Sequence, residues 1–214
     1  MTAFYETYPR FLVSVDCIIF GFAEGKLKLL IQERPYEPEK GMLSLIGGFV
    51  KNDESVDTAA QRVLTQFTGL KDLYMRQLRA FGEVERDKGE RVISVAYYAL
   101  INVGDYNSNQ SDSHGAHWTE FNELPELCFD HNQMVEEALK ELQKSVFEKD
   151  ICNNLLPELF TLSKLQTLHE AILGSPVDKR NFRRSILDRN YIIKTDKIDK
   201  TSSRRGASLY KFKD

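Results

Sequence analysis

GFVKNDESVDTAAQRVLTQFTGL, residues 48–70, joins a glycine-containing turn to an amphipathic helix. The turn follows an apolar run, Leu43–Gly48, that is typical of a strand. Over Ser55–Phe67 the apolar side chains recur at helical spacing, and Gly69 stands where such a helix stops. The pattern therefore predicts a strand, a loop and a helix in this order.

The sequence on either side of this segment predicts a mixed α/β domain. Two β-rich runs, Phe11–Phe20 and Lys26–Gln32, flank the short turn Ala23–Gly25 and predict a hairpin. Leu73–Gly82 and Arg91–Asn102 predict two more strands. The second of these is apolar on both faces, as expected in the middle of a sheet.

Further along the chain, Asn107–Gly115 is polar and predicts a loop. His131–Val146 predicts a helix with Asp130 as its N-cap. The charged residues Glu148–Asp150 mark the expected boundary, which divides the chain into residues 1–150 and 151–214.

The second unit predicts a winged helix-turn-helix, which is a helix, a turn, a helix and a two-stranded basic ribbon. Asp178 is the expected N-cap of the second helix. The predicted elements are a helix over Phe160–Gly174, a helix over Lys179–Arg189, a strand starting at Tyr191–Ile193, a basic loop over Lys194–Gly206 and a strand over Ala207–Phe212.

Composition and charge narrow the classes of function. The net charge is −3, but residues 155–214 carry 13 Lys and Arg against 7 Asp and Glu, a balance that suits a polyanionic partner. No apolar run is long enough to span a membrane, and no secretory signal is apparent. The 3 cysteines are widely spaced, which disfavours disulfides and zinc and indicates a reducing cytoplasm.

Residues 48–70 resemble the Nudix box, G-x5-E-x7-R-E-U-x-E-E-x-G-U, where U is a large aliphatic residue. The positions that match are Gly48, Glu54, Arg62, Leu64, Gly69 and Leu70. Trp118 with Leu124-Pro125 is similar to the last strand and turn of the Nudix fold. The resemblance covers about residues 10–148 and implies an α/β/α domain.

The metal-binding glutamates of Nudix hydrolases are replaced in this chain. Magnesium requires oxygen ligands, but the corresponding positions are Val63, Gln66 and Phe67. Glu54 alone cannot organise a metal-bound diphosphate. We therefore predict no catalytic residue, no metal site and no cofactor, and a domain that serves as an effector sensor.

Candidate effector-binding residues stand near expected strand ends or in the charged loop before Arg91, where binding residues often lie. The same loop is also compatible with an ordinary solvated turn. The candidates are Arg34, Phe49, Phe81, Glu83, Asp87, Arg91 and Tyr97.

Candidate DNA-binding residues come from the second helix of the C-terminal unit and from the ribbon. Arginine and asparagine side chains can read base edges in the major groove, and the other cations suit phosphates. These residues are Lys179, Arg180, Asn181, Arg183, Arg184, Lys194, Lys197, Lys200, Arg204 and Arg205.

Both units together resemble the Nudix-related transcriptional regulators, the NrtR family, and the segments Arg91–Ile101 and Leu155–Gly174 are also similar to it. The resemblance implies a homodimer that binds a palindromic operator in double-stranded DNA under the control of a small molecule. The sequence is most similar to the sugar-responsive branch, which implies a pentose such as arabinose and control of sugar catabolism. The alternative is a regulator of NAD metabolism that senses ADP-ribose.

Two other functions remain open at this point. A Nudix pyrophosphohydrolase with an unusual metal site would release AMP or phosphate from ADP-ribose with magnesium. An adaptor would use the basic C-terminal unit to bind RNA or another protein.

Overall fold

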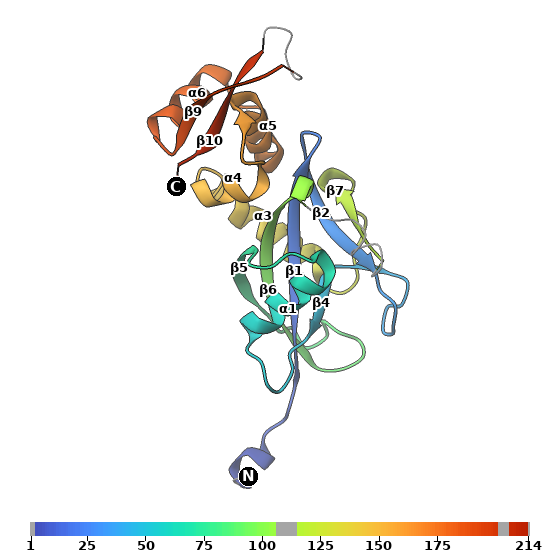
Figure 1. Ribbon diagram of the computed structural model, residues 1–214. Coiled ribbons are helices and arrows are strands. Elements are labelled where there is room, and N and C mark those ends of the chain that lie inside the picture. Colours follow the sequence, from blue (N-terminus) through green and yellow to red (C-terminus); the bar gives the residue numbers. More distant parts are fainter. Residues whose placement is uncertain (1–2, 106–114, 201–205, 214) are drawn as a thin grey trace.

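The computed structural model describes residues 3–105, 115–200 and 206–213. It contains an N-terminal sheet domain and a smaller C-terminal domain (Figure 1). Most of the predicted loop Asn107–Gly115 lies outside the described residues, as do Arg204 and Arg205. No helix in the described part of the chain is long and apolar enough to cross a membrane.

The N-terminal sheet is built around β1 (Leu12–Ala23) and β6 (Val92–Asn102), which pair in parallel. On its other side β1 forms the predicted hairpin with β2 (Lys26–Glu33), and β6 pairs with β5 (Tyr74–Phe81). The turn residues Glu24 and Gly25 both have positive φ, 54° and 78°, as a tight two-residue hairpin requires. β6 is thus an interior strand, as its two apolar faces predicted.

The run predicted as one strand at Leu43–Gly48 is in fact two. β3 (Leu43–Ser44) pairs with β2, whereas β4 (Ile46–Phe49) pairs with β1. β1 and β2 pair only near their hairpin turn, so the segment crosses from one strand to the other at the buried Leu45. β7 (Ala116–Glu120) pairs with β2 and contains Trp118, at the predicted place of the last strand.

Helices cover both faces of this sheet, which confirms the predicted α/β/α arrangement (Figure 1). α1 (Val56–Thr68) is capped by the Ser55 hydroxyl, which accepts from Thr58 N at 3.1 Å, and ends at Gly69 with φ 72°. α3 (His131–Lys144) covers the opposite face. Asp130 is the N-cap residue of α3, as predicted, but its carboxylate makes no cap hydrogen bond and pairs with Arg86 instead.

The C-terminal domain has the predicted winged helix fold. Its helices α5 (Leu162–Leu173) and α6 (Lys179–Asp188) are capped by Thr161 and Asp178, whose side chains accept from Lys164 N and Asn181 N. The sheet runs in the order β8-β10-β9, with ranges Phe160–Thr161, Ala207–Phe212 and Ile192–Asp199. In the N-terminal domain, the described residues also form the short 3-10 helices η1 (Ala3–Thr7), η2 (Val103–Asp105) and η3 (Phe121–Glu123).

Helix α4 (Lys149–Leu155), which the sequence analysis did not anticipate, joins the two domains. The predicted boundary at residue 150 falls inside it and stays a prediction. One buried apolar cluster runs from Phe20 and Leu29 of the large sheet through Leu155 to Leu165 of α5. In addition, Gln143 Nε2 of α3 donates to the Ile172 carbonyl of α5 at 3.0 Å. The winged helix is therefore packed on the N-terminal domain.

Candidate functional site

A cavity of about 450 Å³ opens at the edge of the large sheet where β1 and β4 meet the start of α3. Strand β1 contributes Asp16, and the loop after β2 contributes Arg34. Of the predicted effector residues, Arg34, Phe49 and Asp87 line this one cavity. The structure thus brings together three side chains that are far apart in the sequence.

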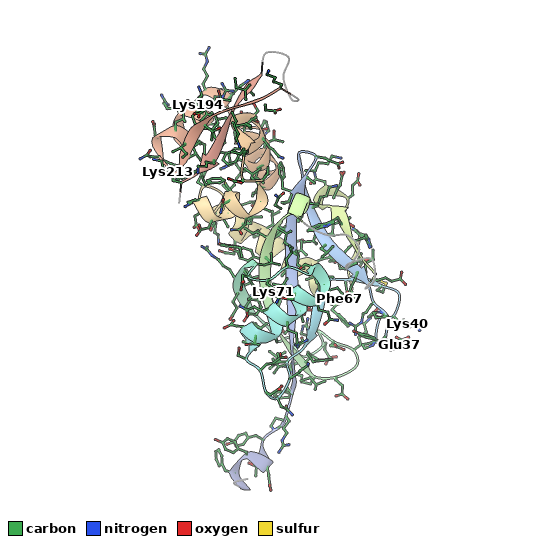
Figure 2. The ribbon with its side chains drawn as sticks, in the orientation of Figure 1. Glu37, Lys40, Phe67, Lys71, Lys194 and Lys213 are labelled. Carbon is green, nitrogen blue, oxygen red and sulfur yellow. The ribbon has the colours of Figure 1, made fainter. Side chains whose placement is uncertain are left out.

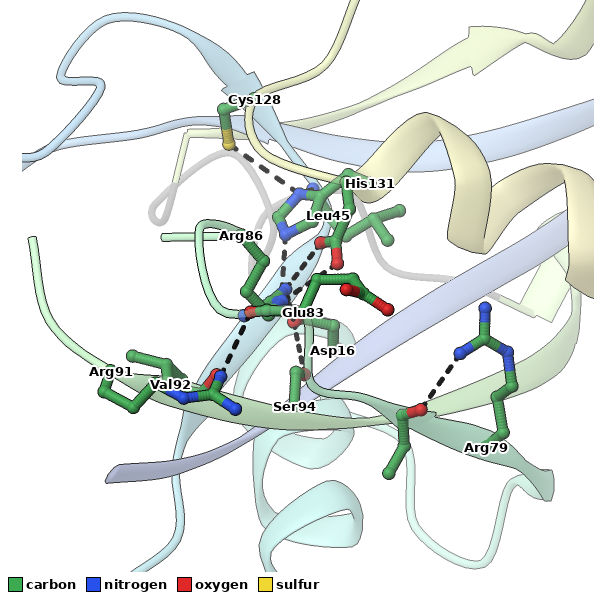
Figure 3. A network of polar contacts seen from close by, with 12 residues as sticks. Asp16, Leu45, Arg79, Glu83, Arg86, Arg91, Val92, Ser94, Cys128 and His131 are labelled. Carbon is green, nitrogen blue, oxygen red and sulfur yellow. Dashed lines mark hydrogen bonds and ion pairs between the residues drawn. The ribbon is translucent and has the colours of Figure 1, made fainter. Parts of the chain in front are cut away.

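The inner wall of the cavity is a network of buried charges (Figure 3). The Arg86 guanidinium binds the Asp130 carboxylate through two hydrogen bonds of 2.6 and 2.9 Å, and its Nη2 lies 3.6 Å from Asp16 Oδ2. Asp16 Oδ2 also accepts a hydrogen bond from the Ser94 hydroxyl at 2.5 Å. Because buried charges are tolerated only when paired, this network holds the cavity wall in one geometry.

His131 completes the wall at the first residue of α3. Its Nδ1 accepts from Leu45 N at 3.0 Å, so the ring proton belongs on Nε2, which faces Asp16 Oδ1 at 3.6 Å (Figure 3). Burial lowers the pKa of His131, so the neutral ring is favoured. The imidazole therefore serves as a neutral link between β1, Leu45 and α3.

Sequence analysis missed Asp16, Arg86 and His131, although one signal was present. Asp16 is the only charged residue in the apolar run Phe11–Phe20, and an acid in a buried strand needs a partner. Gly47 faces Asp16 across the β1–β4 pair, and a Cβ there would lie 2.3 Å from Asp16 Oδ1. Glycine at this position is therefore required by the close approach of the carboxylate.

Arg34 is held in place mainly by contacts to aromatic rings. Its guanidinium carbon lies 4.9 Å from the centre of the Phe129 ring and 5.5 Å from that of Tyr36, and its Nε donates to Pro38 O at 2.6 Å. No carboxylate of the described residues forms an ion pair with it. Arg34 is thus a positioned cation at the cavity whose charge is open to an anionic ligand.

The other predicted effector residues lie elsewhere. Phe81 and Glu83 line a neighbouring hollow of about 520 Å³, which shares Arg86 with the cavity. Arg91 lines neither the cavity nor the hollow. Its guanidinium donates to the carbonyls of Gly82 and Glu83 at 2.8 and 3.0 Å and so stabilises the loop between β5 and β6. Tyr97 is buried and donates to Asp57 of α1 on the opposite face of the sheet.

Helix α1 does not offer the ligands that magnesium would need. Val63 and Phe67 are buried in the core, and the carboxylate of Glu54 binds Arg62 at 2.6 and 2.9 Å. These hydrogen bonds, with one from Lys51 N, lower the pKa of Glu54 to about 2. No cluster of three metal-binding side chains occurs among the described residues. The residues present do not fit the metal site of a Nudix hydrolase.

The C-terminal domain presents a cationic helix face. Phe182 and Ile186 anchor α6 in the core. The predicted recognition residues are all exposed on the other side of α6, and they are Lys179, Arg180, Asn181, Arg183 and Arg184. Arg184 Nη2 donates to Asn181 Oδ1 at 3.4 Å, so these two side chains lie together on the exposed face.

The predicted basic loop at Lys194–Gly206 is partly a strand. Lys194 and Lys197 lie within β9, because residues 192–199 pair with β10, for example Lys194 with Tyr210. Lys200 follows the strand directly, and all three side chains are exposed. Lys194 lies on the C-terminal domain away from the large sheet (Figure 2). Arg204 and Arg205 belong to the part of the chain that the structure does not describe.

Two family models match the chain in the order of its domains. The NUDIX domain model matches residues 10–140, and the model of the NrtR DNA-binding winged helix domain matches residues 152–212. The ADPR responsive transcriptional repressor NtrR of Acinetobacter baylyi is 32% identical over 209 residues, which cover 96% of this chain and 83% of that protein. The ADP-ribose pyrophosphatase of Methanocaldococcus jannaschii is 31% identical over 136 residues, 64% of this chain and 78% of its own.

Among solved structures, Shewanella oneidensis NrtR complexed with a 27mer DNA superimposes with a TM-score of 0.82 at 30% identity, over 94% of this chain and 93% of that one. The isolated NUDIX domain of the same protein, complexed with ADP ribose, gives a TM-score of 0.54 at 26% identity over 66% of this chain and 99% of that one. These relatives give no support to the predicted sugar-responsive branch. Fold, domain order and likeness over nearly the whole length agree: the chain belongs to the NrtR family of DNA-binding transcriptional regulators, in which a Nudix domain precedes a winged helix domain.

Proposed function

We propose that this protein is an ADP-ribose-responsive transcriptional repressor that binds a palindromic operator as a homodimer. The observation that carries the proposal is the pairing of a positioned but unneutralised cation, Arg34, in the Nudix cavity with an exposed cationic face on α6 of the winged helix. The first suits a phosphate-containing effector and the second suits DNA.

The cavity favours a nucleoside diphosphate over a free pentose. A diphosphate needs cations, and Arg34 supplies one at the cavity with its guanidinium plane against two rings. An adenine ring needs a flat apolar surface, and the exposed rings of Tyr36 and Phe49 offer it at the mouth. Asp87 supplies an acceptor for ribose hydroxyls. A pentose carries neither charge nor base and would leave Arg34 and both rings unused.

The Nudix domain binds its effector without hydrolysing it in this proposal. Val63 and Phe67 belong to the core, and Glu54 is neutralised by Arg62, so α1 supplies no set of oxygen ligands for a cation. The likeness to an ADP-ribose pyrophosphatase argues for the same ligand class. Because of the same likeness, hydrolysis of ADP-ribose is the alternative outcome that must be measured.

Helix α3 connects the effector cavity to the recognition helix. It begins at His131 in the cavity wall, and just beyond its end Phe147 contacts His169 of α5 at 4.8 Å between ring centres. Arg189, the C-cap of α6, stacks on the same Phe147 ring at 4.6 Å. A shift of α3 on effector binding would therefore reach both helices of the winged helix.

The test is selection of genomic DNA fragments by the purified protein at physiological salt, with and without ADP-ribose, arabinose and xylose. We expect one palindrome whose occupancy falls with ADP-ribose only. A response to a pentose alone would overturn the effector assignment. Binding that is sequence-blind and strongly salt-dependent would overturn the assignment as an operator-specific regulator.

A parallel assay incubates the protein with ADP-ribose and magnesium and measures AMP release. We expect no turnover above the rate without protein. Magnesium-dependent release that is lost in Glu54→Gln would establish the hydrolase instead.

A further inference from the structure

Two polar atoms at the inner end of the effector cavity form no hydrogen bond with the described residues. Ser94 donates to Oδ2 of Asp16, and Leu45 N donates to Nδ1 of His131. The remaining polar side-chain atoms, Asp16 Oδ1 and His131 Nε2, are the unpaired ones, and we name them the inner pair. Asp16 and His131 are only 7% and 3% exposed, and both line the cavity.

The inner pair is spaced for a third group. Nε2 and Oδ1 lie 3.6 Å apart and face each other (Figure 3), which is too far for a direct hydrogen bond. An atom placed to one side of the line between them can lie about 2.8 Å from each. Gly47 leaves the carboxylate uncovered here, because a Cβ at residue 47 would lie 2.3 Å from Oδ1. Since buried polar groups nearly always have partners, we expect a polar atom in the cavity to occupy this place.

The donor and acceptor roles of the inner pair select the chemistry of that atom. His131 Nδ1 accepts from Leu45 N, and burial lowers the pKa of His131, so the neutral ring carries its proton on Nε2 and donates there. Asp16 Oδ1 accepts. A hydroxyl group matches both roles, because it accepts and donates at one atom. An ionised phosphate has no proton to give to Asp16, and an ammonium group has no acceptor for His131.

Arg34 and His131 contact the same aromatic ring. The centre of the Phe129 ring lies 4.9 Å from the Arg34 guanidinium carbon and 5.5 Å from the centre of the His131 ring. A ligand whose phosphates bind Arg34 can therefore place the adjoining group at the inner pair. In ADP-ribose the diphosphate joins adenosine to a terminal ribose. With the adenine on the exposed rings of Tyr36 and Phe49 at the mouth, the terminal ribose falls at the inner end.

We propose that Asp16 and His131 bind a hydroxyl of the terminal ribose of the effector, and that this contact distinguishes ADP-ribose from ADP. The inference rests on the proposed function and names the part of the ligand on which selectivity depends. ADP contains the same adenosine and a diphosphate of at least equal charge, so Arg34 and the rings at the mouth would not favour ADP-ribose over it. With ADP the inner pair stays unpaired, and a site that leaves buried polar groups unpaired rejects such a ligand.

The experiment is calorimetric titration of the full chain with ADP-ribose and, separately, with ADP. We expect the wild type to bind ADP-ribose about 10- to 100-fold more tightly than ADP. Asp16→Asn and His131→Asn should each lose most of this preference, because they weaken binding of ADP-ribose and leave the affinity for ADP near that of the wild type. Asp72→Asn, at an exposed site that does not line the cavity, is the matched control and should keep the full preference.

Both variants are chosen to preserve the rest of the wall. In Asp16→Asn the amide oxygen is expected on the side of Ser94 and Arg86, which both carry donors, so that the amide NH2 faces His131 and the acceptor is lost. Arg86 keeps its two hydrogen bonds to Asp130. In His131→Asn the shorter side chain retains an acceptor for Leu45 N but has no atom at the place of Nε2. Urea unfolding of each variant verifies that it is folded.

The ratio of the two affinities separates a ligand contact from a structural role. Damage to the cavity wall weakens both ligands alike, so an unchanged ratio in both variants would overturn the hydroxyl contact while the effector assignment stands. If the wild type binds neither nucleotide but binds arabinose or xylose, and Asp16→Asn abolishes that binding, the effector assignment is wrong and the hydroxyl contact stands. A wild type that binds none of the four ligands would overturn both.

Discussion

His169 is an uncharged imidazole in the contact layer between the two domains. It is fully buried, and its ring centre lies 4.8 Å from that of Phe147 and 4.9 Å from that of Phe182. Burial lowers the pKa of His169 from 6.5 to about 4. In the unfolded chain His169 therefore becomes protonated below about pH 6.5, whereas in the folded chain it stays neutral down to about pH 4. The free energy of unfolding thus decreases as the pH falls through this window.

Replacing this ring should reduce the acid sensitivity of the fold. Between about pH 7 and pH 5, we expect the wild type to lose about 2 kcal/mol more of its free energy of unfolding than His169→Leu. Urea unfolding at both pH values measures the difference. His117→Leu, at an exposed site on β7, serves as the control and should behave like the wild type. If the pH dependence is the same in His169→Leu as in the wild type, folding does not lower the pKa of His169.

Substitutions of Arg34 test whether this side chain binds the effector. We expect Arg34→Met to weaken ADP-ribose binding about 10- to 100-fold, because a cation opposite the diphosphate is lost. Arg34→Lys should recover only part of the affinity, since lysine lacks the planar group that lies against Tyr36 and Phe129. Calorimetric titration measures both. Arg76→Met, a surface arginine paired with Glu148, is the control, and a matching loss there would contradict a specific role.

At the scale of elements, local signals predicted α1 well and β9 poorly. The apolar spacing of α1, Ser55 before it and Gly69 after it are all local, and the helix occupies Val56–Thr68. β9 alternates lysine and aspartate with few apolar residues, so its sequence resembles a loop. Pairing with β10 makes it a strand, and such pairing depends on residues that are distant in the sequence.

Helix α6 carries the prediction for DNA recognition. Arg183→Ala and Arg184→Ala should each weaken operator binding by about 1–3 kcal/mol if the side chain contacts a base, and relax the preference at one position. Lys194→Ala on β9 should weaken operator and random DNA alike and reduce the salt dependence. Fluorescence anisotropy with both DNAs measures these effects. Lys71→Ala, on the Nudix domain, is the control; wild-type affinity in both arginine variants would exclude α6 as the recognition helix.

The contact between Phe147 and Arg189 carries the prediction for coupling. Phe147→Leu keeps an apolar side chain but removes the ring on which the Arg189 guanidinium stacks. We expect operator affinity without effector and ADP-ribose affinity without DNA to stay near wild type. The coupling free energy between the two ligands should fall by about 0.5–2 kcal/mol. Operator titrations at several ADP-ribose concentrations measure the coupling free energy. An unchanged value would show that the contact between Phe147 and Arg189 does not couple the effector cavity to the recognition helix.

For the whole molecule, the fold was predictable and the cavity was not. The Nudix box and the basic ribbon are continuous stretches of sequence, so motif and composition identify them. The cavity wall joins Asp16, Arg86 and His131, which come from a strand, a loop and a helix start. Their proximity arises only when the sheet is assembled. Tyr97 shows the same limit, since strand position alone did not decide which face of the sheet it occupies.

The packing of the two domains predicts how the operator must be spaced. The apolar cluster that joins β1 and β2 to α4 and α5 fixes the winged helix on the Nudix domain, so the proposed dimer would hold its two recognition helices at one separation. Inserting about five base pairs between half-sites turns one half-site to the opposite side of the DNA, and about ten base pairs restores the side but adds about 34 Å. We expect both insertions to reduce binding to the affinity of a single half-site. Recovery with the longer insertion would mean that the winged helices are tethered rather than packed, and effector binding could not then act by reorienting them.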